Sequence, residues 1–256
     1  NNWTFKEYKP SSHLVKVIKN FWTFEYDKDE LRFDYFLPSG MAYLFFMKTD
    51  EEFSSSFLES QGESLIDDGL YAGYINSRVE FAHKKINVVG IALYPVYLEI
   101  LFKDGPRRFM NRFSKINECD VFSVDELSKM PLDKIMSALE SFIGHHLKEN
   151  PINSEVLQTY KRVKEIKEYK SSVEELSHYT SYSTRQLNNL FNKNLGISPK
   201  RFVQIVRFNH GLQLMDDKVQ LSKIAQKLGY HDQAHFIKDV KKISGMTPKE
   251  IVRSED

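Results

Sequence analysis

The chain has 256 residues with 36 Lys and Arg against 35 Asp and Glu, so its formal net charge is +1. This length allows one large domain or two ordinary ones. A composition of 41% hydrophobic and 28% charged residues is typical of a globular protein and argues against a disordered or fibrous one. No apolar run approaches the roughly 18 residues of a membrane span, and no signal-peptide pattern begins the chain. The single cysteine, Cys119, excludes an internal disulfide and a multi-cysteine zinc site. We therefore expect a cytoplasmic protein with no membrane association.

The near-zero net charge conceals an asymmetry between the two parts of the chain. Residues 1–154 carry 18 Lys and Arg and 23 Asp and Glu, a net charge of −5. Residues 155–256 carry 18 Lys and Arg and 12 Asp and Glu, a net charge of +6. A basic half indicates contact with a polyanion such as a nucleic acid. Protein surfaces also vary by a few charges without any function, so the interpretation needs support from motifs.

The first hundred residues contain short runs of aromatic and aliphatic residues separated by Gly, Ser, Asp and Asn. Such runs predict strands joined by turns. They lie at residues 21–26, 33–38, 41–47, 70–75 and 88–94. Of the 34 aromatic residues, 25 precede residue 155. We expect a β-rich domain here, barrel-like or sandwich-like, with flanking helices.

From about residue 95 the pattern changes to short helices at 95–102 and 123–130 and a longer one at 131–147. The longer helix has an apolar stripe at helical spacing. The stripe comprises Ile135, Leu139, Phe142 and Ile143, widened by Leu132 and Met136. Two interpretations stay open: the stripe closes the core of the β-rich domain, or it forms the contact of a homodimer. The segment 148–153 then breaks the pattern, so we place two domains at residues 1–150 and 151–256.

A short phrase occurs twice in the second half of the chain, as "GISPK" at 196–200 and "GMTPK" at 245–249. In each copy Gly ends one helix, and Ser or Thr followed by Pro begins the next. The helix ended by each copy has its own start signal: Ser183 with Gln186 forms a capping box, and Asp232 is an N-cap residue. A further capping box, Ser172 with Glu175, begins the helix before the first of these. The pattern predicts an all-α domain with two helix-turn-helix units joined by a long helix at 198–215.

The second helix of the first unit, at 183–196, has one apolar face and one polar face. Leu187, Leu190 and Phe191 point inward. The outward set is Thr184, Arg185, Asn188, Asn189, Asn192 and Lys193. In a helix-turn-helix the second helix enters the DNA major groove, where Arg suits guanine and Asn suits adenine. An ordinary solvated face would usually carry more Glu, and this face carries no acid. We therefore predict that this helix reads bases.

The corresponding helix of the second unit, at 232–245, directs Phe236, Val240 and Ile243 inward. Its outward set is Gln233, Ala234, Ile237, Lys238, Lys241 and Lys242. We expect Gln233 and Lys238 to read bases, and the Lys-rich end to contact phosphates. Ala234 and Ile237 either touch a thymine methyl group or pack against the protein. His235, beside Phe236, is expected to be structural and not a ligand.

The stretch "LSKIAQKLGYHDQAHFIKDVKKISGMTPKEI" completes the pattern, and residues 173–251 resemble the DNA-binding domain of AraC/XylS-type bacterial transcription regulators. The shared features are an I-A helix, a Gly-aromatic turn, a D-Q-x-x-F helix and a final G-x-[ST]-P. The resemblance implies two units on a rigid linker helix that reach adjacent major grooves of double-stranded DNA. It also implies an N-terminal half that senses an effector or dimerises. Two positions depart from the family: Val240 replaces the usual Phe, and Ile237 stands where Ser or Thr is common.

The first 150 residues are similar to an uncharacterised β-rich domain often found before this DNA-binding unit. We therefore predict a sequence-specific DNA-binding transcription regulator, controlled by a small organic effector or a protein partner at its N-terminal domain. No N-terminal residue is assigned to a ligand. The alternative is a DNA-repair methyl-acceptor enzyme with the same DNA-binding unit, which needs several cysteines to activate a thiolate. The single Cys119, flanked by Glu118 and Asp120, argues against it. The sequence carries no catalytic motif, so we expect no enzyme activity, no cofactor and no metal site.

Overall fold

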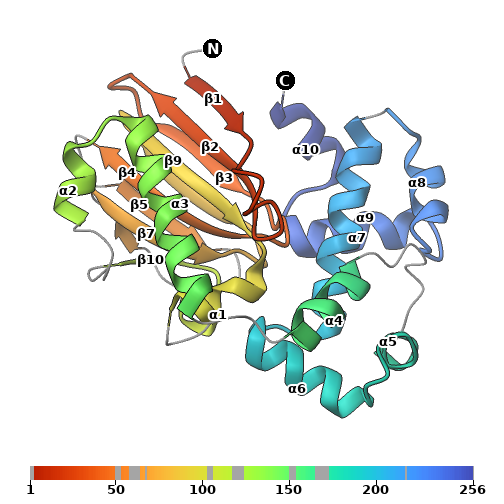
Figure 1. Ribbon diagram of the computed structural model, residues 1–256. Coiled ribbons are helices and arrows are strands. Elements are labelled where there is room, and N and C mark those ends of the chain that lie inside the picture. The colour runs from red at the N-terminus through yellow and green to blue at the C-terminus, as the bar shows by residue number, and fades with distance from the viewer. Residues whose placement is uncertain are drawn as a thin grey trace. The chain divides into compact units, whose positions relative to one another are not determined.

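The computed structural model describes residues 3–49, 53–57, 64–66, 68–102, 106–116, 124–149, 154–164, 173–216 and 218–255 (Figure 1). Residue contacts divide the chain into two units. Unit 1 comprises Asn1–Phe36, Met41–Ile75 and Val79–Ile152. Unit 2 comprises Leu37–Gly40, Asn76–Arg78 and Asn153–Asp256. None of the described helices combines the length and the hydrophobicity that a bilayer crossing requires.

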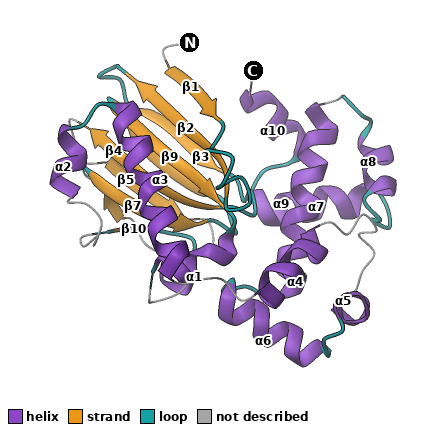
Figure 2. Ribbon diagram, viewed as in Figure 1, coloured by secondary structure: helices purple, strands orange, loops and turns teal. Residues whose placement is uncertain are grey.

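Unit 1, in its described part, contains two antiparallel sheets (Figure 2). The first has the strand order β1-β2-β9-β4-β7-β10, with bounds Trp3–Tyr8, Ile18–Tyr26, Ile86–Leu93, Ala42–Thr49, Gly69–Tyr74 and Phe113–Lys115. The second has the order β3-β8-β5-β6, with bounds Arg32–Phe36, Val79–His83, Phe53–Phe57 and Ser64–Ile66. Each of the five predicted strand runs overlaps one of these strands. The other five strands were not predicted.

The two sheets pack around one shared aromatic core. Unit 1 is therefore sandwich-like, which is one of the two architectures that the sequence predicts. Successive side chains of a strand point to opposite faces, so alternate residues of a strand lie on the same face. Trp22 of β2, Phe45 of β4 and Val88 of β9 therefore pack in one cluster with Val79 and Phe81 of β8. The residues between them, such as Leu44 and Val89, are buried on the other face of the first sheet.

The helix α3 (Leu132–Glu149) packs on this first sheet, in contact with β9 (Figure 1). Its four stripe residues, Ile135, Leu139, Phe142 and Ile143, are all buried. Met136 is half-buried, and the side chain of Leu132 lies outside the described residues. The stripe therefore closes the core of unit 1, and the interpretation that it forms a dimer contact is wrong. The remaining short elements are η1 (Pro95–Tyr97), α1 (Leu98–Leu101), η2 (Pro106–Phe109) and α2 (Val124–Lys129).

The described residues of unit 2 after 153 form helices joined by short loops (Figure 2). The helices are α4 (Ser154–Lys164), α5 (Val173–Thr180), α6 (Thr184–Asn194), α7 (Pro199–Asp216), α8 (Leu221–Lys227), α9 (Gln233–Ser244) and α10 (Pro248–Glu255). The linker α7 has 18 residues, as the sequence predicts. The helix pairs α5–α6 and α8–α9 are each in contact. This arrangement agrees with the predicted all-α C-terminal part.

The caps predicted from the repeated phrase are present. Ser183 Oγ accepts a hydrogen bond from the backbone N–H of Gln186, whose side chain in turn accepts from the Ser183 N–H. Asp232 Oδ1 accepts from the His235 N–H at 2.7 Å. Gly196 and Gly245 have φ values of 68° and 72°, the left-handed conformation that ends a helix. Ser172, predicted to cap the preceding helix, lies outside the described residues.

Replacing Leu139 by Asp should unfold unit 1, because Leu139 has no exposed surface and an unpaired buried carboxylate costs several kcal/mol. Ser141→Asp is the matched control, since Ser141 is exposed on the same helix. It should melt close to the wild-type temperature. Thermal unfolding of the full chain followed by circular dichroism checks both. A folded Leu139→Asp variant with unchanged stability would contradict the burial of the stripe.

Candidate functional site

The helix α6 presents the six residues predicted to face DNA, and none of them is buried. Leu187 and Phe191 anchor the opposite face inside unit 2, and Leu190 is half-buried. Of the outward set, Arg185, Asn189 and Lys193 are exposed, whereas Thr184, Asn188 and Asn192 are half-buried. The division into an inner and an outer face therefore agrees with the predicted periodicity.

Two asparagines of α6 are held in place by their own helix. The Asn188 side-chain N–H donates to the carbonyl oxygen of Thr184, and the Asn192 side-chain N–H donates to that of Asn188, both at 2.8 Å. These bonds restrict the rotamers of both amides. A side chain ordered before binding loses less conformational entropy when it meets a base. The side-chain oxygens of both residues have no partner among the described residues.

The helix α9 packs through Phe236, Val240 and Ile243, which are buried in one cluster with α7 and α8. Its outward residues Gln233, Ala234, Lys238, Lys241 and Lys242 are exposed. Ile237 is half-buried, at the edge between the two faces. Val240, which stands where the family usually has Phe, is one of the residues of this core.

The residues near the start of α9 hold its orientation. The Tyr230 hydroxyl donates to Asp239 Oδ2 at 2.8 Å, and the guanidinium of Arg207 on α7 lies 4.5 Å from the centre of the Tyr230 ring. Burial raises the pKa of Tyr230 and keeps the phenol protonated, as this donation requires. His235 is exposed and meets the Tyr230 ring edge-on at 5.3 Å. Its expected structural role stays a prediction. Tyr230 thus connects the linker helix to α9.

A second candidate site lies in unit 1, where the two sheets enclose a cavity of ≈ 290 Å³. Nine of its fourteen lining side chains are aromatic, and the charged ones are Arg32 and Asp34. Trp3 and Phe5 on the edge strand β1 line it while 38% and 47% exposed, so they lie at its open side. The sequence indicated aromatic clefts in this domain but assigned no residue to a ligand.

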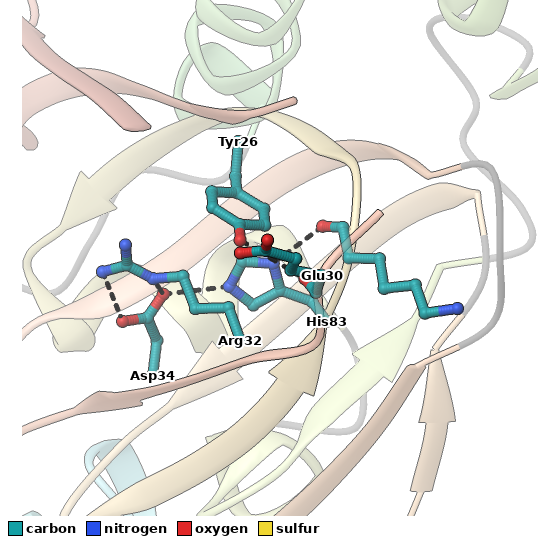
Figure 3. Close-up of polar contacts among 6 residues, drawn as sticks. Tyr26, Glu30, Arg32, Asp34 and His83 are labelled. Carbon is teal, nitrogen blue, oxygen red and sulfur yellow. Dashed lines mark hydrogen bonds and ion pairs between the residues drawn. The ribbon is translucent and has the colours of Figure 1, made fainter. Parts of the chain in front are cut away.

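Charged groups from two strands meet beside this cavity (Figure 3). Nε and a terminal nitrogen of Arg32 donate to the two carboxylate oxygens of Asp34 at 2.5 and 2.8 Å. Nε2 of His83 lies 2.9 Å from Asp34 Oδ2, and its Nδ1 lies 2.9 Å from the carbonyl oxygen of Lys84. The Arg32 guanidinium also lies 5.6 Å from the ring centre of Tyr26. Strands β3 and β8 of the second sheet thus hold an ion-paired cluster beside an apolar space.

The neighbours of Asp34 keep it ionised. Burial opposes the charged form, but hydrogen bonds from His83 and Arg32 outweigh it and lower the pKa of the Asp34 carboxyl. The hydrogen bond with Asp34 raises the pKa of Arg32 in turn, against the effect of burial. The Arg32–Asp34 pair therefore persists as two charges at neutral pH.

Two residues of this cluster, Arg32 and Asp34, could have been recognised from the sequence. Residues 32–36 read R-F-D-Y-F, and a strand places Arg32, Asp34 and Phe36 on one face. Two charged residues on the same face as an aromatic one are unusual for a core-facing strand. His83 gave no local signal, because it joins the cluster only through the pairing of β3 with β8. Among the described residues, no three His, Cys, Asp or Glu side chains group in a way that could hold a metal ion.

Residues 176–254 match the family model of a helix-turn-helix domain, and residues 6–114 match that of a domain of unknown function, DUF6597. The chain carries an AraC-type helix-turn-helix domain. It is accordingly a DNA-binding transcription regulator. No curated protein sequence matches the chain. In the AraC-type domain, α6 and α9 are the helices that carry the twelve predicted DNA contacts.

Two solved structures are similar in fold over both units. ToxT from Vibrio cholerae O395 is 12% identical, with a TM-score of 0.52 over 98% of this chain and 96% of that one. ToxT bound to (E)-4-(8-methylnaphthalen-1-yl)but-3-enoic acid is also 12% identical, with a TM-score of 0.53 over 98% of each chain. At this identity the likeness shows the fold alone. It supports a β-rich domain followed by the AraC-type domain.

The Asp34→Asn variant should lose stability in a pH-dependent way. A carboxyl whose pKa is lowered on folding stabilises the protein above its unfolded pKa, near the ordinary 3.8, and loses this effect as the pH falls through the folded value. The variant should therefore be less stable by about 2 kcal/mol at neutral pH, the magnitude of a hydrogen bond to a charged group. The difference should shrink below about pH 4.

Urea unfolding across a pH series measures this difference. Glu25→Gln is the control, because Glu25 is an exposed carboxylate on β2 outside the cluster. Its unfolding midpoint should stay near that of the wild type. If the free energies of unfolding of Asp34→Asn and the wild type differed by the same amount down to strongly acidic pH, the ionised carboxylate would not be what stabilises the fold.

Proposed function

We propose that this transcription regulator recognises a specific DNA sequence through α6 and α9 and that a small molecule in the cavity of unit 1 controls the recognition. The observation that carries the proposal is the AraC-type domain at 176–254. The second helix of each helix-turn-helix unit, α6 or α9, presents an outward set of residues that contains no acid. A cationic or neutral face meets the phosphate backbone without repulsion. The net charge of +6 over residues 155–256 supports the same conclusion.

The two helices are suited to different tasks. The outward set of α6 contains three asparagines and Arg185, which offer the donors and acceptors that discriminate base edges in the major groove. The outward set of α9 ends in Lys241 and Lys242, which are exposed point charges suited to phosphates. Ile237 at the edge of α9 offers an apolar contact in place of a hydroxyl. We therefore assign most base reading to α6 and most anchoring to α9.

Control by a small molecule is supported by the cavity in unit 1. ToxT, which has a similar fold, has been solved with an aryl-butenoic acid bound. The cavity here is apolar, mostly aromatic and open at one side, as ligand sites usually are. A homodimer stays a prediction from the family resemblance alone. We further propose a cytoplasmic protein without enzymatic activity, because Cys119 is the only cysteine available to a methyl acceptor.

Alanine substitutions should separate base reading from anchoring. Arg185→Ala, Asn188→Ala and Asn189→Ala should each weaken the cognate site by about 1–3 kcal/mol, the discrimination of a good bidentate contact, and relax preference at particular bases. Lys241→Ala and Lys242→Ala should weaken cognate and scrambled duplexes alike and flatten the salt dependence. Fluorescence anisotropy with both duplexes at several salt concentrations measures these effects, after the cognate site is selected from random DNA.

Lys134→Ala is the control for the lysine variants, because Lys134 is exposed on α3 in the other unit. It should leave both affinities unchanged. Equal losses on cognate and scrambled DNA for all three α6 variants would remove the assignment of base readers. Failure of the wild-type chain to prefer any sequence during selection would reject the proposed function as a whole.

A further inference from the structure

An aliphatic patch lies on the outward face of α9. It consists of Ala234, which is exposed, and Ile237, which is half-buried. The two residues are three positions apart on the helix, so their side chains are neighbours. The sequence leaves two interpretations open for them: contact with a thymine methyl group, or packing against the protein. The contacts of α9 distinguish between the two.

The core of unit 2 does not use this patch. The α9 residues that are buried in the cluster with α7 and α8 are Phe236, Val240 and Ile243. Neither Ala234 nor Ile237 is among the described hydrophobic residues that lie in this cluster or pack against it half-buried. Packing against this core therefore does not account for an isoleucine at residue 237.

The rotation of α9 about its own axis is fixed from two sides. The core residues hold its inward face, and one flank is held by the hydrogen bond of 2.8 Å from the Tyr230 hydroxyl to Asp239 Oδ2. Arg207 on α7 lies 4.5 Å from the centre of the Tyr230 ring and holds that ring in turn. Asp239 follows Ile237 by two residues, which is roughly 200° around the axis at 3.6 residues per turn. The acid is therefore held on the flank opposite Ile237.

The flank that carries Ile237 also carries groups for a base edge and for a phosphate. Gln233 lies four residues before Ile237 and Lys241 four residues after it, so the three side chains form one row along the helix. Gln233 and Lys241 are both exposed. The amide suits adenine, and the ammonium suits a phosphate. Ile237 is the fifth residue of α9, within the N-terminal part of the helix that contacts base edges in a helix-turn-helix.

An isoleucine side chain matches one group of the major groove. It neither donates nor accepts a hydrogen bond, so it has no favourable contact with the amino, keto and ring-nitrogen groups of the base edges. The 5-methyl group of thymine is the apolar group that B-DNA displays there. Contact between the two removes apolar surface from water, which is favourable in proportion to the area. A cytosine in the same place would turn its amino group toward a side chain that cannot accept.

We propose that Ile237, together with Ala234, reads the 5-methyl group of a thymine in the major groove, near an adenine that Gln233 reads. The second helix-turn-helix unit then contributes a preference for a T·A pair by apolar contact, while its lysines hold the DNA backbone. The inference deepens the proposed function and rests on it, because it needs α9 to lie in the major groove.

Replacement of thymidine by deoxyuridine tests the proposal with the wild-type chain. The replacement removes the 5-methyl group and leaves base pairing unchanged. Each thymidine of the duplex selected from random DNA is replaced in turn, and the affinity is measured by fluorescence anisotropy. At least one thymidine should show a loss of about 4-fold, the effect of one methyl-sized group left in water. A selected site in which no thymidine gives such a loss would overturn the proposal.

Ile237→Ala identifies the thymidine concerned. This variant should bind the thymidine and deoxyuridine forms of that position nearly equally, because the methyl group no longer meets the isoleucine, and losses at other thymidines should stay. Leu190→Ala is the matched control, since Leu190 is a half-buried aliphatic residue on the inward side of α6. It should retain the wild-type pattern of losses. If the Ile237→Ala variant kept every loss of the wild type, the assignment to Ile237 would be wrong.

Ile237→Val keeps the test decisive if Ile237→Ala does not fold. It removes a single methyl group from the side chain, so the loss at the same thymidine should decrease from about 4-fold toward about 2-fold. An unchanged loss would overturn the assignment. Failure of the wild type to select any sequence would reject the proposed function. A selected site without a thymidine that depends on Ile237 would overturn this inference alone, so the two failures are distinguishable.

Discussion

The alternation of side chains along the central strands of unit 1 is the constraint on which the rest of that unit depends. Strands β2, β4 and β9 are buried on both faces over most of their length, so most of their side chains pack against fixed neighbours. One face packs against α3 and the other forms an aromatic wall. A shift of register by one residue would exchange these faces and place Trp22 toward the helix. The cavity therefore exists because the register is specified from both sides.

The same constraint explains why a charged cluster is tolerated beside an apolar space. Arg32 and Asp34 lie two residues apart on β3, so they share the face on which Phe36 joins the aromatic core. Burying either charge alone would cost several kcal/mol. Their bidentate pairing and the contact with His83 offset much of this cost.

In unit 2 the decisive interactions are local. Caps at Ser183 and Asp232 start the two outward-facing helices, and left-handed glycines end them. These contacts span only a few residues. The start, the end and the outward-facing side of each helix therefore follow from its own sequence. The tertiary contribution is the orientation of each helix on its neighbours. Tyr230, through Arg207 and Asp239, supplies part of that orientation for α9.

The sequence by itself determined the strands rich in aromatic residues, the ends of the helices around the repeated phrase, and the outward faces of α6 and α9. Periodicity, capping and turn chemistry act over a few residues, so they can be recognised in a single chain. Strands such as β8 have mixed composition and form only by pairing with neighbours. Only the tertiary structure decided the cavity between the two sheets. Antiparallel pairing sets Arg32 opposite His83, and β2 and β9 supply Trp22 and Gly90 from the other sheet. Such contacts join residues tens of positions apart, and nothing local in the chain encodes them.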